Sequence, residues 1–167
     1  MDLNSASAAD PGPGAPDMLA RASDFSRYVR LLLAGESDLS ACVELDRTWD
    51  AERMRARLTR LSTDGASLER ALRRVRKEVM LALIARDLSG LADLQEVVAT
   101  STALAQTAID AAVDGLHSAL AQQYGEPRGE ESGAPQKLHV VGMGKLGGSE
   151  LNVSSDIDLI LLYPEEG

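Results

Sequence analysis

The sequence predicts an α+β protein in which an N-terminal antiparallel helical bundle precedes a short β-rich segment. Two observations support this fold class. From Met18 onward, apolar residues recur every three or four positions, a spacing that aligns them on one face of a helix. After about residue 137, the apolar residues form two short continuous runs instead, as in strands.

Composition divides the chain into four stretches. Residues 1–17 are rich in Ala, Ser, Gly and Pro, and we expect a disordered tail there. Residues 18–124 make up the helical region. Residues 125–136 hold three Gly and two Pro without periodicity, which indicates a linker or exposed loop. Residues 137–167 then begin a second domain.

Within the helical region we expect four helices. The first covers residues 18–34 and ends at Gly35. The second starts at the capping side chains of residues 37–40 and runs to about Leu61. The third and fourth helices are the clearest, because each has a row of apolar or small residues spaced three or four apart. The row of the third helix is Leu68, Leu72, Val75, Val79 and Leu83. The row of the fourth is Leu94, Val98, Ser101, Ala105, Ala108, Ala112, Leu116 and Leu120.

Composition also limits the function. The formal net charge is −9, so the chain repels phosphate backbones and we expect no binding to nucleic acid. The sequence has no apolar run of membrane-spanning length and no basic, apolar leader, so we expect a cytoplasmic protein without membrane contact. The single cysteine, Cys42, is expected to be a small, buried apolar side chain in a reducing cytosol.

The residues that indicate chemistry lie between Gly142 and Asp158. A glycine-rich stretch follows the first apolar run, and glycine lets a backbone approach a phosphate closely. Ser154 and Ser155 then precede Asp156-Ile157-Asp158. In a strand, the two aspartates would share one face while Ile157 turns into the core.

Two adjacent carboxylates repel each other unless a cation binds them, and Mg²⁺ prefers one or two carboxylates together with substrate phosphates. An Asp-x-Asp pair is usually a solvated strand edge. Here, however, the acids interrupt an apolar run just after a glycine loop, which favours a metal and phosphate site.

The same glycines also match the dinucleotide-binding pattern G-x-G-x-x-G over residues 142–147. That pattern requires a long helix to begin at the loop, and the following GSELNVSSD is too short for one. A dinucleotide-binding oxidoreductase fragment and a non-catalytic helical module are the alternatives to an enzyme that handles phosphates.

The segment GMGKLGGSELNVSSDIDLILLY resembles the bifunctional glutamine synthetase adenylyltransferase/adenylyl-removing enzymes, a family within the DNA polymerase β-like nucleotidyltransferase superfamily. Residues 73–97 resemble the helices that lead into the first catalytic domain of that family. The resemblance implies that inorganic phosphate removes AMP from a tyrosine of glutamine synthetase and releases ADP. It also implies a second domain that transfers AMP from ATP, and regulation by the PII signalling protein.

By the same resemblance, Asp156 and Asp158 are the catalytic residues and bind magnesium. The implied nucleotide contacts are Gly147, Gly148 and Ser149 in the turn beside the phosphates, with Ser155 and Lys145 as further phosphate contacts. The superfamily places a third carboxylate on a later strand, and this chain stops before one. Since two strands do not form a stable sheet, we expect a truncated domain that is inactive in isolation.

Other polar residues receive a structural interpretation. His139 is expected to be an ordinary strand residue. The arginines of residues 53–60 and 70–76 are expected on solvated helix faces, where they are also available to dock an acidic partner. Arg86 and Asp87, at a helix end, are expected to form a buried pair.

Overall fold

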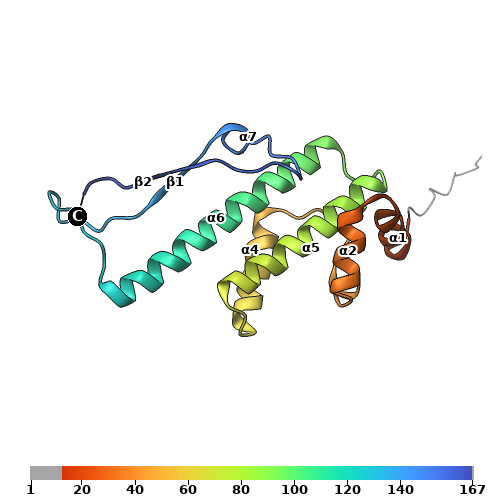
Figure 1. Cartoon of the computed structure of the whole chain (residues 1–167), viewed down its shortest axis with the longest axis horizontal. Coiled ribbons are helices and arrows are strands. Elements are labelled where there is room, and N and C mark those ends of the chain that lie inside the picture. Colours follow the sequence, from red (N-terminus) through yellow and green to blue (C-terminus); the bar gives the residue numbers. More distant parts are fainter. Residues whose placement is uncertain (1–12, 167) are drawn as a thin grey trace, which may run out of the picture.

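A computed structural model describes residues 13–166, and this part of the chain is mostly helical with one small sheet (Figure 1). The helical region of the sequence analysis and the short sheet after it are both present. The elements are α1 (Ala15–Phe25), α2 (Arg27–Gly35), α3 (Leu39–Cys42), α4 (Ala51–Thr63), α5 (Leu68–Leu88), α6 (Leu94–Tyr124), β1 (His139–Gly142), α7 (Gly144–Gly147) and β2 (Leu159–Leu162).

The single helix expected over residues 18–34 is wrong, because Ser26 divides it into α1 and α2. Ser26 has φ −119° and ψ 112°, and its hydroxyl accepts a hydrogen bond from the backbone N–H of Val29 at 3.3 Å. A serine in this conformation caps a new helix instead of continuing the old one. Helix α1 begins at Ala15, inside the stretch expected as a tail, and residues 1–12 of that stretch lie outside the described residues.

The continuous second helix is also wrong. After the short α3, residues 43–50 leave the helical path and insert the side chains of Leu45 and Trp49 into the core, where they are 3% and 6% exposed. Asp50 then accepts a hydrogen bond from the backbone N–H of Arg53 at 2.8 Å and starts α4. Burial of two large apolar side chains and this cap together outweigh helix continuity.

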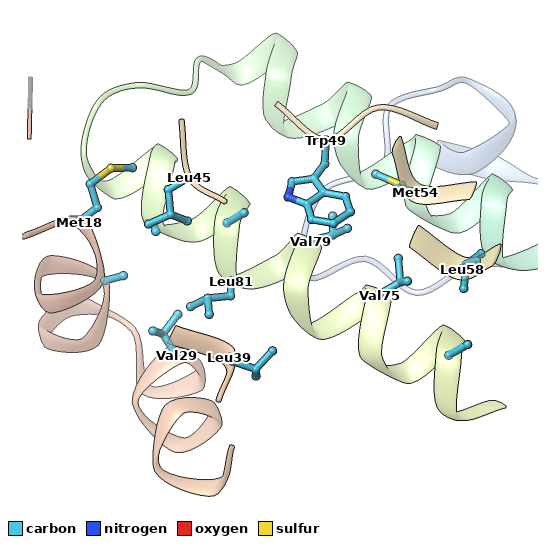
Figure 2. Packing of buried hydrophobic residues seen from close by; sticks show 14 residues of the cluster. Met18, Val29, Leu39, Leu45, Trp49, Met54, Leu58, Val75, Val79 and Leu81 are labelled. Carbon is cyan, nitrogen blue, oxygen red and sulfur yellow. The ribbon is translucent and has the colours of Figure 1, made fainter. Parts of the chain in front are cut away.

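Helix α5 is the centre of the helical layer, and α1, α2, α4 and α6 all pack against it. Its predicted apolar row is confirmed, since Val75 and Val79 are buried beside Met54 and Leu58 of α4 and beside Trp49 (Figure 2). The row predicted for α6 is buried only in part. Its outer members are exposed, namely Leu94 at 72%, Leu116 at 60% and Leu120 at 53%.

Arg86 pairs with Glu96 of α6, so the pair expected with Asp87 is wrong. The Nε of Arg86 donates to Glu96 at 2.6 Å, while its Nη1 and Nη2 donate to the carbonyl oxygens of Leu45 and Leu91 at 2.9 and 3.4 Å. Neighbours in a helix point around the axis in different directions. The guanidinium therefore joins α5, the loop before α4 and the start of α6.

Glu78 forms a second buried ionic centre between α4 and α5. Arg57 donates to both of its carboxylate oxygens, at 2.7 and 2.8 Å, and the Nε of Arg74 donates at 2.7 Å. Burial by itself would raise the pKa of Glu78, but the hydrogen bonds from Arg57 and Arg74 outweigh it and hold the pKa below its usual value of 4.5.

We expect Glu78→Gln to reduce stability near neutral pH and to flatten its dependence on acid. A carboxyl with a lowered pKa in the folded state stabilises the protein above its unfolded pKa, and this contribution disappears as pH falls through the folded value. Urea unfolding at a series of pH values should therefore show a difference in the free energy of unfolding between parent and variant, and this difference should disappear at acid pH. Glu69→Gln, on the exposed face of α5, is the control and should give no such difference.

The sheet consists of β1 and β2, paired antiparallel with His139 opposite Leu162 and Gly142 opposite Leu159. His139 is a strand residue, as predicted. Before it, residues 125–136 form a turn in which Arg128 Nη1 donates to the carbonyl oxygen of Gly133 at 2.8 Å. The large apolar side chains of β2 are 39–59% exposed, so the helices leave this sheet largely uncovered.

Candidate functional site

The glycine-rich stretch folds back tightly at the end of β1. A Cβ atom added at Gly147 would lie 2.5 Å from the carbonyl oxygen of Gly142, so this approach excludes any side chain at position 147. Gly144 has a φ of +52° and Ser149 a φ of +56°, both in the left-handed region. The side chain of Leu146, within this turn, is buried. The sequence therefore uses its glycines to build a compact turn beside β1.

The amide groups of this turn are mostly used within it. The N–H groups of Gly147, Gly148 and Ser149 donate to the carbonyl oxygens of Met143, Gly144 and Leu146, at 3.2, 3.0 and 3.1 Å. The role of the three residues at a nucleotide stays a prediction.

Gly147→Ala should destabilise the turn by about 1–3 kcal/mol, because the new methyl group meets a backbone oxygen that has no freedom to move aside. Gly148→Ala is the matched control. Its Cβ would meet its nearest neighbour, the carbonyl oxygen of Gly144, at an ordinary 3.5 Å, and its φ of −80° suits any residue. Faster amide hydrogen exchange at residues 142–149 in the first variant alone would verify the difference. Equal exchange in both would contradict it.

A second turn presents the two serines. Asn152 Oδ1 accepts hydrogen bonds from the Ser154 N–H at 3.2 Å and from the Ser155 hydroxyl at 2.8 Å. The ammonium group of Lys145 lies 3.4 Å from the Ser155 hydroxyl oxygen. Leu151 is buried, and its N–H donates to Thr102 Oγ1 of α6 at 3.3 Å. The structure thus brings Lys145 and Ser155 together and attaches the serine turn to α6.

Asp156 and Asp158 lie in the loop before β2, which begins only at Leu159, so their placement within a strand is wrong. The carbonyl oxygen of Asp158 accepts from the Met143 N–H at 2.9 Å, which extends the β1–β2 pairing by one step to the glycine turn. Ile157 is 38% exposed, so the expectation that it turns into the core is wrong too. Residues 151–157 lie beside a cavity bounded by α5 and α6, and Ile157 lines that cavity instead of a closed core.

The two carboxylates suit a hard divalent cation. Both are exposed, and within residues 13–166 neither takes part in an ion pair or a side-chain hydrogen bond, so their oxygens are available. The same range contains no group of three or more acidic, histidine or cysteine ligands. A pair of carboxylates matches the way proteins hold Mg²⁺, whose remaining positions are filled by water and substrate phosphates.

A cavity of about 460 Å³ adjoins Asp156 and Ser155. Its other walls come from α5, α6, Leu58 of α4 and residues 151–153 and 157, and they are mainly apolar. Arg73 and Arg76 of α5 also line it and bring positive charge to it. A cavity of this size with a few polar groups is typical of a small-molecule site.

Sequence reasoning missed two parts of this arrangement. Arg73 and Arg76 are exposed, as expected for a solvated helix face, and Arg73 pairs with Glu69 at 3.6 Å. Only the packing of residues 151–157 against α5 and α6 reveals that both arginines also line the cavity. Asn152 organises both serines, and its position two and three residues before Ser154 and Ser155 is the sequence pattern of an Asx turn.

The geometry does not fit the dinucleotide-binding alternative. A dinucleotide-binding site needs parallel strands joined by a long helix, and the N-terminus of that helix binds the pyrophosphate. Here β1 and β2 are antiparallel, and α7 has four residues.

Within residues 13–166, no helix combines the length and apolar character needed to cross a bilayer.

Comparisons with known proteins agree with the resemblance seen in the sequence. The profile of the glutamate-ammonia ligase adenylyltransferase family matches residues 18–167. Three similar proteins each carry the name bifunctional glutamine synthetase adenylyltransferase/adenylyl-removing enzyme. The protein from Nitrosomonas eutropha is 48% identical over 86% of this chain, and the protein from Chromobacterium violaceum is 47% identical over 89%. The Burkholderia mallei protein is 52% identical over 67%.

These relatives are much longer than this chain. The matched part makes up 16% of the Nitrosomonas protein, 17% of the Chromobacterium protein and 13% of the Burkholderia protein. The chain therefore spans about a sixth of the length of the curated relatives it matches.

Proposed function

Because the chain belongs to the glutamate-ammonia ligase adenylyltransferase family, we propose that it is part of an enzyme that removes AMP from a tyrosine of glutamine synthetase. The printed names of the relatives support glutamine synthetase as the protein substrate and adenylyl removal as one of two activities. The observation that supports the adenylyl-removing assignment is the sequence segment ELNVSSDIDL, which resembles the corresponding segment of the first catalytic domain of the family.

The proposed reaction is a phosphorolysis. An oxygen of inorganic phosphate attacks the phosphorus of the AMP–tyrosine bond, the phosphorus–oxygen bond to tyrosine breaks, and the tyrosine oxygen takes a proton. The products are ADP and unmodified glutamine synthetase. Transfer of AMP from ATP to the same tyrosine is assigned to a second catalytic domain, and the PII signalling protein is the proposed regulatory partner.

Asp156 and Asp158 would hold Mg²⁺. When bound, Mg²⁺ neutralises charge on the phosphate oxygens and orients them for in-line displacement. Lys145, Ser149 and Ser155 are proposed to bind phosphate oxygens through an ammonium group and two hydroxyls. Support for this group comes from the 3.4 Å separation of Lys145 Nζ and Ser155 Oγ, and from the backbone pairing of Asp158 with the glycine turn.

Gly147 and Gly148 would support the nucleotide indirectly by giving the turn its shape. Close approach of Gly147 to β1 sets the direction of the backbone that presents Ser149. The positive side chains of Arg73 and Arg76 at the cavity favour an anionic substrate there, although the chain as a whole is acidic.

Nucleotide binding tests this proposal against the non-catalytic helical module. Calorimetric titration of the 167-residue chain with ADP should give binding that depends on Mg²⁺ and is lost in Asp156→Asn. Asp24→Asn, an exposed aspartate of α1, is the control and should bind like the parent. Equal binding with and without Mg²⁺, or in all three proteins, contradicts the metal site.

We expect the 167-residue chain by itself to leave adenylylated glutamine synthetase unchanged. Within residues 13–166 no group of three or more acidic, histidine or cysteine ligands is present, and the resemblance implies a third carboxylate on a strand that is not among these residues. Incubation with phosphate and Mg²⁺ should therefore release no ADP above background. Sustained Mg²⁺-dependent release would show that two carboxylates suffice.

A further inference from the structure

A second cavity, of about 390 Å³, lies on the other side of α4 from the cavity beside Asp156. Four of its lining residues are arginines, Arg47, Arg53, Arg57 and Arg60, and we call it the arginine pocket. Two glutamates, Glu44 and Glu78, also line it, which leaves two positive charges in excess. This local charge contrasts with the formal net charge of −9 for the chain.

We propose that the arginine pocket docks an acidic peptide segment of a protein partner. The proposal goes beyond the enzymatic function and does not depend on it. In an acidic chain, a confined positive cavity attracts an acidic segment locally while the rest of the surface repels acidic partners. Electrostatic complementarity of this kind determines where and in which orientation a partner binds.

The pocket retains donors for such a segment. Glu78 engages the Nε and Nη2 of Arg57, and Glu44 engages the Nε and Nη2 of Arg47. Within residues 13–166, Arg60 has no ion pair or side-chain hydrogen bond, and it is exposed. Its planar guanidinium is thus available to bind a carboxylate through two parallel hydrogen bonds.

The shape and composition of the pocket favour a peptide carboxylate over a phosphate or a nucleic acid. Glu44 and Glu78 add negative charge within the pocket, which disfavours a dianion more than a single carboxylate. Ala56 lines the same cavity and offers apolar surface to the methylene groups of a glutamate side chain, while the Arg53 guanidinium lies over the Trp49 ring. The acidic remainder of the chain repels a long polyanion such as nucleic acid.

The arginine pocket is separate from the candidate active site. Arg57 faces the pocket while its neighbour Leu58 lines the cavity beside Asp156. On α5, Glu78 lines the pocket while Val75 and Arg76 line the cavity. A segment in the arginine pocket therefore leaves the cavity open, and α4 and α5 contribute residues to both sites.

The chain provides two internal reporters of occupancy. Cys42 and Trp49 both line the arginine pocket, and they are the single cysteine and the single tryptophan of the sequence. The expectation that Cys42 is buried is wrong, because it is exposed at the end of α3. A hexaglutamate peptide should slow alkylation of the Cys42 thiol by about fivefold or more at saturation and should change the Trp49 fluorescence with the same midpoint. Raising the salt concentration should weaken both effects, because the contacts are ionic and solvent-accessible.

The test uses the 167-residue chain and charge variants at exposed positions. Arg60→Ala should weaken hexaglutamate binding by about fivefold, and the Arg47→Ala/Arg60→Ala variant should abolish protection of Cys42, since a bidentate charged contact is among the stronger hydrogen bonds. Arg70→Ala, an exposed arginine of α5 outside the pocket, should bind like the parent. Circular dichroism of each variant confirms the fold.

Three outcomes overturn the proposal. The first is absence of protection by hexaglutamate in the parent chain. The second is equal protection in the parent and in the Arg47→Ala/Arg60→Ala variant. The third is protection by inorganic phosphate at the same concentration as the peptide, which would make the pocket a site for a free anion.

Discussion

Asp156→Asn and Asp158→Asn should each reduce phosphate-dependent release of ADP from adenylylated glutamine synthetase by about 10²-fold or more, assayed in the full-length product of the gene. Each substitution replaces a carboxylate that Mg²⁺ prefers with a neutral amide, and Mg²⁺ holds its octahedral geometry strictly. Transfer of AMP from ATP, assigned to a different domain, should continue. Both half-reactions are measured on the same protein preparation.

Thermal melting accompanies these assays, because a loss of fold would also abolish activity. We expect no drop in melting temperature, since neutralising one of two neighbouring exposed acids relieves repulsion. Asp24→Asn is the control for removal of an exposed carboxylate elsewhere. Near-parental ADP release in either site variant would exclude these aspartates as the metal site. Loss of both activities together with the melting transition would make them structural residues.

Arg86→Ala should lower the free energy of unfolding by about 3–5 kcal/mol, the largest effect expected outside the candidate site. The side chains of Arg86 and Glu96 are only 10% and 14% exposed. Removing the guanidinium leaves the Glu96 carboxylate nearly buried without its partner, and it takes donors away from the carbonyl oxygens of Leu45 and Leu91. Urea unfolding followed by circular dichroism measures the change.

Asp87→Asn is the matched control, because Asp87 is adjacent to Arg86 in sequence but is exposed and takes no part in the pair. It should change stability by no more than about 0.5 kcal/mol. Glu96→Gln should fall between the two, since an amide oxygen still accepts from Arg86. If Arg86→Ala costs no more than Asp87→Asn, the buried pair does not stabilise the junction of α5 with α6.

Prediction was correct for residues whose local sequence pattern is sufficient to determine their secondary structure. The apolar row of α5 is one case, because spacings of three and four leave no competing structure over 21 residues. The glycine turn is another, since the short and polar GSELNVSSD leaves no room for a long helix after Gly147. The local pattern located the segment of the candidate site, the family resemblance assigned its residues, and their chemical roles stay predictions.

Failures arose where a local pattern competed with packing. Ser26 and Asp50 each satisfy backbone donors that would otherwise belong to a continuing helix, and burial of Leu45 and Trp49 draws the intervening chain into the core. That Arg73 and Arg76 also line a cavity depends on residues 151–157 lying against α5 and α6, which are distant from them in the sequence. Charge spacing in a single helix contains no such information.

By itself, the sequence determined the helical region, the compact glycine turn and the order in which the serines and aspartates follow it. Those features depend on backbone freedom and on side-chain spacing, which are local. Only the tertiary structure decided that Asp158 pairs with Met143, that Arg86 joins Glu96, and that four arginines share a pocket with Glu78. These are contacts between distant segments, and their geometry follows from how the apolar faces of α4, α5 and α6 are buried together.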